Sequence, residues 1–159
     1  MASFSRRPGA MIAASALLIG LVLTAAMAAE DYVRTAGGLT IYFGILPSAM
    51  TKGHPSSHEE ATMHGGPGGS AHRFHILVAV FDAVTGKRVE DANVSATITG
   101  LGLAGTKKVL EPMRIADTTT YGNYYDLGGS SRFRIAVEVQ QPSKTKPVTV
   151  EFAYQHSLR

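Results

Sequence analysis

The sequence contains no cysteine. This absence excludes disulfide bonds, thiolate metal sites, c-type haem attachment and thiol redox chemistry. A domain of this size can still fold without disulfides if its hydrophobic core is adequate. Any soft metal would therefore have to be held by histidine and methionine, because imidazole and thioether are the soft ligands that remain.

The usual catalytic motifs are also missing. There is no Gly-x-Ser-x-Gly nucleophile elbow and no His-Glu-x-x-His zinc motif. The glycine-rich stretch 65–69 lacks the Lys-Ser/Thr pair of a phosphate loop and leads into a predicted strand instead of a helix. A histidine-brace copper monooxygenase needs a histidine as its first mature residue, where we expect Ala29. These absences predict a protein that is not an enzyme.

The charge of the chain gives no support for nucleic-acid binding. The formal net charge is +3, and two of the positive charges, Arg6 and Arg7, lie close to the N-terminus. No basic stripe with interleaved aromatic side chains follows. We therefore expect no nucleic-acid partner.

The first 28 residues have the pattern of a secretory signal peptide. The basic pair Arg6-Arg7 is followed by an uncharged, mostly apolar stretch that ends in Ala26-Met27-Ala28, which fits the small-x-small rule for cleavage. We predict cleavage after Ala28 and a periplasmic mature protein with no stable membrane insertion. The alternative is an uncleaved anchor, because residues 11–29 are almost long enough to span a membrane.

The remaining residues, 29–159, predict one all-β domain. Short segments rich in β-branched and aromatic residues alternate with turns every 8–12 residues, which favours an immunoglobulin-like antiparallel β-sandwich of about seven strands. Residues 29–38 are expected to be a lead-in segment, and Pro112 predicts that its strand lies at a sheet edge. The predicted strands are 39–46, 73–82, 89–99, 107–115, 118–127, 132–140 and 148–154.

Residues 48–72 interrupt this pattern with a long loop that is rich in glycine, histidine and methionine. Loops longer than about 12–15 residues are usually functional or disordered. Five of the six histidines lie in or just after this loop, and two methionines lie among them. This biased composition is typical of metal binding. The predicted ligands are His54, His58, His64, His72, His75, Met50 and Met63.

Each of these side chains also has a structural interpretation. A loop of glycine, serine and histidine can be merely soluble, and His75, at the start of a strand, can be a histidine of the core. Met113 can supply another sulfur ligand, but core packing is the preferred interpretation. Tyr121, Tyr124 and Tyr125 can form a sugar-binding platform, although tyrosines near a strand corner more often pack the sandwich and hydrogen-bond across it.

Residues 78–94 carry a recurring pattern: a strand, Asp82-x-x-Thr85-Gly86-Lys87, and an Ala92-x-Val94 strand start. Together with Tyr121-Gly122-Asn123-Tyr124, it resembles small periplasmic immunoglobulin-like domains of the YtkA/FixH and copper-resistance CopC types, over about residues 74–154. The resemblance implies a periplasmic role in metal handling or assembly. CopC-type proteins usually begin with a histidine ligand that this chain lacks, so no ligand is carried over from them.

These observations predict a non-enzymatic periplasmic metal-binding protein, a metal chaperone or a resistance factor. Copper is the favoured ion, with zinc, nickel or iron as alternatives. Because ligation requires neutral imidazole, we expect binding to weaken below about pH 6. A metal-free envelope module that binds a protein or a polysaccharide is the second hypothesis, and a hydrolase or oxidase with a metal centre in the loop is the third.

Overall fold

The computed structural model describes residues 32–51, 70–115 and 117–155. The predicted all-β class is confirmed. In chain order the elements are β1 (Val33–Ala36), β2 (Leu39–Pro47), α1 (Ser48–Thr51), β3 (Arg73–Asp82), β4 (Asn93–Gly100), β5 (Thr106–Ile115), β6 (Thr118–Asp126), β7 (Arg132–Gln140) and β8 (Val148–Gln155). The predicted signal peptide lies outside the described residues. Within them, no helix has the length and apolar character needed to cross a membrane.

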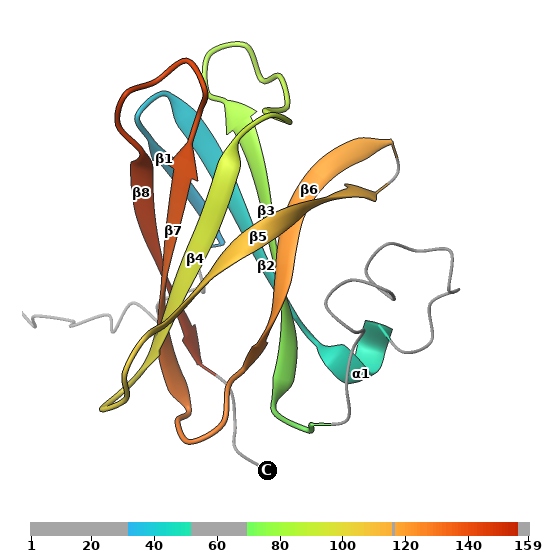
Figure 1. The fold of residues 1–159 in the computed structure, drawn as a ribbon, viewed down its shortest axis with the longest axis vertical. Coiled ribbons are helices and arrows are strands. Elements are labelled where there is room, and N and C mark those ends of the chain that lie inside the picture. The colour runs from blue at the N-terminus through green and yellow to red at the C-terminus, as the bar shows by residue number, and fades with distance from the viewer. Residues whose placement is uncertain (1–31, 52–69, 116, 156–159) are drawn as a thin grey trace, which may run out of the picture.

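The strands form two packed antiparallel layers (Figure 1). Their order is β1-β2-β3-β6-β5-β4-β7-β8, and β5 links the layers because its first half pairs with β4 and its second half with β6. A side chain links the two end strands: Arg34 Nε on β1 donates to the backbone carbonyl of Glu151 on β8 over 3.2 Å. The sandwich is therefore nearly closed.

The expected edge position of the strand with Pro112 is wrong for the strand as a whole, because β5 lies inside the sheet order. Among the described strands, however, the second half of β5 pairs with β6 alone, with Pro112 opposite Tyr121. A proline cannot donate to a strand ladder, so it is tolerated where one side of the strand is unpaired. The pairing of each half separately explains why a central strand accepts a proline.

The segment expected as a lead-in contains a strand, β1, so the described part of the chain has eight strands where about seven were predicted. Gly37 and Gly38 have φ values of 57° and 82°, a conformation that glycine adopts without a steric cost, and they turn β1 back onto β2. Thr35 and Thr40 face each other across this hairpin, with their hydroxyls 3.3 Å apart. The strand escaped prediction because four residues are too short for a clear alternation.

The core fills the space between the layers and is built by strict alternation along the strands. On β3, for example, Phe74, Ile76, Val78 and Val80 are buried in the core cluster. Two tyrosines of β6 join it and hydrogen-bond across the sandwich: the Tyr121 hydroxyl donates to the Val89 carbonyl (3.2 Å) and the Tyr125 hydroxyl to the Ala96 carbonyl (2.8 Å). For these two residues the structural interpretation is confirmed.

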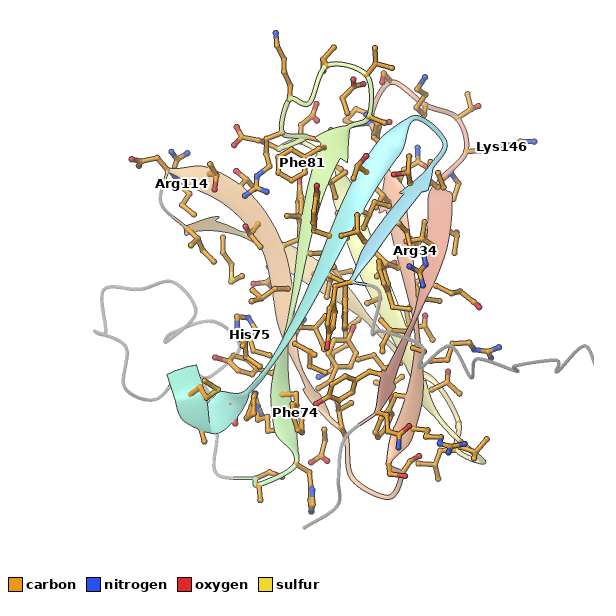
Figure 2. The ribbon with its side chains drawn as sticks, turned by 180° about the vertical axis from the view of Figure 1, so that it is seen from behind. Arg34, Phe74, His75, Phe81, Arg114 and Lys146 are labelled. Atoms are coloured by element: carbon orange, nitrogen blue, oxygen red, sulfur yellow. The ribbon has the colours of Figure 1, made fainter. Side chains whose placement is uncertain are left out.

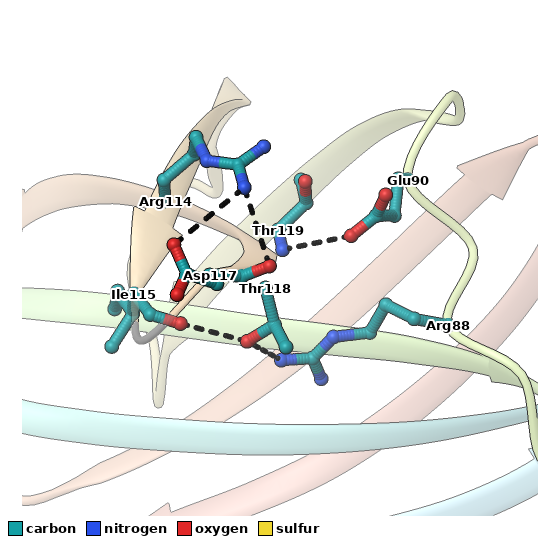
Figure 3. A network of polar contacts seen from close by, with 7 residues as sticks. All are labelled: Arg88, Glu90, Arg114, Ile115, Asp117, Thr118 and Thr119. Atoms are coloured by element: carbon teal, nitrogen blue, oxygen red, sulfur yellow. Dashed lines mark hydrogen bonds and ion pairs between the residues drawn. The ribbon is translucent and has the colours of Figure 1, made fainter.

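A polar network fastens the hairpin between β5 and β6 to the loop before β4 (Figure 3). Arg88 donates to the Thr118 hydroxyl over 2.9 Å, and the backbone N–H of Thr119 donates to Glu90 over 3.2 Å. Arg114 lies 3.9 Å from the Asp117 carboxylate, and Asp117 has a positive φ of 61°. This network fixes the end of the sandwich remote from α1.

Candidate metal site

His75 is a buried histidine on the outer face of the sandwich. It lies on β3 between the core residues Phe74 and Ile76, so its side chain points away from the core. Its exposed fraction is nevertheless only 1%. In the sheet it stands opposite Leu46 on β2 and Tyr124 on β6. Figure 2 shows His75 on the side of the molecule that carries α1. A histidine hidden on the face that strands usually turn to solvent is the feature around which the site is built.

An aromatic ring supports the imidazole of His75. The Tyr124 ring stacks on it with centroids 4.5 Å apart and planes inclined by 20°. The Arg73 guanidinium lies 4.9 Å from the centre of the same tyrosine ring. Tyr124 is itself 1% exposed and is absent from the core cluster. It therefore belongs with His75, on the outer face.

Gly122 opens the space beside His75. A Cβ atom at this glycine would lie 2.9 Å from His75 Nε2 and 2.6 Å from the terminal methyl of Met113. Both distances are shorter than real Cβ contacts, so only a glycine lets these two side chains meet here. Met113, on β5, is 1% exposed and, like Tyr124, stands outside the core cluster. An imidazole and a thioether side chain thus converge over one glycine.

Charged groups surround this pair. Glu111 stands directly opposite Gly122 in the β5–β6 register, so its side chain leaves the sheet on the same face. Lys108 donates to the Tyr124 carbonyl over 2.6 Å. Burial, and next the charge of Arg73, lower the pKa of Lys108. Arg73 and Glu111 therefore lie on the same outer face as His75, and Lys108 is held at the backbone of Tyr124, the residue opposite His75.

The predicted loop begins and ends next to His75. α1 follows β2 directly, two residues after Leu46, and Ser70 precedes β3. Of the predicted ligands, Met50 lies on α1 and is 63% exposed, and His72 is exposed in the turn before β3. The His72 carbonyl accepts from Leu127 N over 2.8 Å, which places this turn against the end of β6.

The remaining predicted ligands, His54, His58, Met63 and His64, lie outside the described residues, so the full ligand set stays a prediction. Within the described residues, no group of three histidine or acidic side chains could hold a metal ion. The donors that the structure does bring together are His75 and Met113. Met113 is buried, in line with the preferred packing interpretation, but it lies outside the core cluster. Its approach to His75 was not predicted; the signal for it is Gly122, because a glycine inside a strand often marks a close approach.

No family model matches the chain, and no curated protein sequence matches it. Solved structures do match its fold. A copper-bound variant of FetP from uropathogenic Escherichia coli superposes with a TM-score of 0.62 at 12% identity, over 80% of this chain and 95% of FetP. Copper-reconstituted P19 from Campylobacter jejuni gives 0.62 at 12% identity, over 79% and 92%. The fold is that of FetP and P19.

A third match, a DUF4426 family protein from Pseudomonas aeruginosa, has a TM-score of 0.54 at 17% identity, over 78% of this chain and 94% of that protein. The resemblance to metal-handling β-sandwich domains is thus confirmed at the level of the fold. None of these proteins is described as a member of the YtkA/FixH or CopC families. The identities are low, so the likeness extends to the fold alone.

Proposed function

We propose that this chain is an exported, non-enzymatic copper-binding protein whose site is built around His75 and Met113. The observation that carries the proposal is the convergence of these two buried side chains over Gly122, where a Cβ would lie 2.9 Å from the imidazole nitrogen and 2.6 Å from the Met113 methyl. Imidazole suits copper, and a thioether adds preference for Cu(I). Copper in FetP and P19 supports this choice of ion over zinc, nickel or iron.

Further ligands would come from the predicted set of His54, His58, His64, His72, Met50 and Met63. The chain enters the segment that holds most of them at α1 and leaves it at Ser70, both beside the His75 end of β3. Strands hold His75 and Met113 from two sides, while the other donors belong to a glycine-rich loop. Such a combination of fixed and loop ligands suits a protein that accepts and passes on an ion. When bound, copper would supply a soft Lewis acid.

The proposal also places the protein in the periplasm. The predicted signal peptide supports export, and FetP with a TM-score of 0.59 and 15% identity was produced recombinantly in the periplasm of Escherichia coli.

A titration of the exported protein with Cu(I), Cu(II), Zn(II) and Ni(II) tests this function. We expect the tightest binding for copper and a loss of at least tenfold in copper affinity for His75→Ala and for Met113→Leu, a change that nearly conserves volume. His156→Ala, at the one histidine outside the predicted set, and Leu110→Met, in the core half of β5, are the matched controls and should bind copper normally. Failure of all four metals to bind would favour the metal-free interaction module instead.

A further inference from the structure

A hollow of about 420 Å³ lies where β4 ends and β7 begins. It is lined by residues 99–103, at the end of β4 and in the following loop, and by residues 132–134, at the start of β7. In Figure 1 this is the lower end of β4 and β7, near the turn between β6 and β7. The volume falls within the range of sites for small molecules, about 300–1,000 Å³.

The apolar part of the hollow comes from a loop that is held in place. Leu101 N donates to the Arg132 carbonyl over 3.1 Å and Leu103 N to the Gly100 carbonyl over 3.0 Å. The loop nevertheless keeps two large apolar side chains in solvent: Leu101 is 76% exposed and Leu103 is 47% exposed. Fixed and exposed leucines beside a hollow mark a surface that an apolar group can cover.

The polar part of the hollow is cationic. Arg132 and Arg134 alternate with the buried Phe133, so both guanidinium groups leave β7 on the outer face. Neither forms an ion pair within the described residues, and no acidic residue lines the hollow. On the paired strand β8, the nearest carboxylate in register is that of Glu151, opposite Ala136 and two pairs beyond Arg134. Two unpaired arginines on one strand are well suited to a carboxylate or phosphate group.

We infer that this hollow binds a small amphiphilic anion, with the carboxylate or phosphate head on Arg132 and Arg134 and the apolar body against Leu101 and Leu103. A few polar groups beside a mainly apolar wall is the usual composition of a ligand site. The site shares no residue with the His75 region, so it requires no copper. It stands independently of the proposed metal function.

Four probes with the same twelve-carbon chain test the inference: dodecanoate, dodecyl phosphate, dodecanol and dodecyltrimethylammonium, each titrated into the exported protein below its micellar concentration. We expect at least one anion to bind at least tenfold more tightly than the alcohol and the cation, with amide shifts in NMR spectra confined to residues 99–103 and 132–134. The two anions distinguish a carboxylate ligand from a phosphate ligand. Equal binding of the cation, or shifts that map elsewhere, would overturn the inference.

The variants separate head and body. The double variant Arg132→Gln, Arg134→Gln should bind the preferred anion at least tenfold more weakly and bind dodecanol unchanged. Leu101→Ser should lower the affinity for both probes. All three positions are exposed, so folding should be unaffected. Arg114→Gln, an exposed arginine at the other end of the molecule, is the control and should bind like the parent protein. If the double variant binds the anion as well as the parent does, the arginines are not the site.

Discussion

His75 and Tyr124 stack face to face across the β3–β6 ladder, with their ring centroids 4.5 Å apart. This contact decides how the imidazole can turn, because a stacked ring has only one plane available to it. The pair lies on the outer face of its layer and yet is almost inaccessible to solvent. We therefore regard Tyr124 as a positioning residue for the proposed ligand His75.

The first prediction concerns this stacking. Replacement Tyr124→Phe keeps the ring, so copper affinity should stay within about threefold of the parent value. Replacement Tyr124→Leu removes an aromatic pair that contributes about 0.5–1.5 kcal/mol, and we expect copper affinity to fall up to about tenfold as the imidazole loses its fixed orientation. Competition with a Cu(I) chelator measures the affinity, and circular dichroism checks the fold. Equal affinity of the Phe and Leu variants would contradict the positioning role.

The second prediction concerns the glycine under His75 and Met113. In Gly122→Ala the new methyl group would also lie 3.0 Å from the Ile76 carbonyl, so backbone as well as side chains must shift. We expect a destabilisation of about 1–3 kcal/mol, as in overpacked cores, together with a loss of copper binding. Urea unfolding and copper titration measure the two effects.

Gly44→Ala is the matched control for this substitution. Gly44 also lies inside a strand, β2, but its added Cβ would meet Leu77 at 3.5 Å, an ordinary van der Waals contact. The free energy of unfolding of this variant should lie within about 1 kcal/mol of the parent value, and the variant should bind copper normally. If Gly44→Ala lost as much stability and copper binding as Gly122→Ala, both glycines would be needed for their backbone flexibility and not for the space over them.

The fold was predictable because its signals are local. Alternation on β7 shows directly in Phe133, Ile135, Val137 and Val139, all of which lie in the core. Asp82 and Gly86, which belong to the recurring sequence pattern, form a local turn with Gly86 at a φ of 67°. The position of β5 was not predictable, because pairing of its two halves with different strands depends on contacts distant in sequence.

The candidate site was predictable only in part for the same reason. His75 is adjacent in sequence to the biased loop, so composition alone drew attention to it. Met113 lies 38 positions farther along the chain and reaches His75 only through the β5–β6–β3 order of strands. A short apolar context cannot distinguish a methionine of the core from one beside an outward histidine. Gly122 has meaning only once its two neighbours are known.

The third prediction concerns acid stability at the Asp82 turn. The Asp82 carboxylate accepts from Thr85 N (2.7 Å) and from the Thr85 hydroxyl (2.8 Å), and these bonds lower its pKa. A carboxyl group with a lowered folded-state pKa stabilises the fold above its unfolded pKa, and this contribution is lost as pH falls through the folded value. Asp82→Ala should therefore unfold earlier in urea at pH 6, with the difference shrinking toward pH 3. A difference that is independent of pH would contradict the role of the charged carboxylate.

The fourth prediction concerns alkaline stability and Tyr125. Burial raises the pKa of this phenol, whose hydroxyl donates to the Ala96 carbonyl over 2.8 Å. An unfolded tyrosine ionises near pH 10, so the folded state binds the phenol proton more tightly than the unfolded state does. The stability that this proton contributes to the fold is complete below about pH 10 and is lost as the pH rises above that value. Tyr125→Phe should cost about 1–2 kcal/mol at pH 7, because the Ala96 carbonyl loses its donor. The difference in urea midpoint between the parent and Tyr125→Phe should therefore be smaller at pH 11 than at pH 8. Tyr121 is present in both proteins and does not affect this difference. A difference that stays constant would show that Tyr125 does not ionise on unfolding.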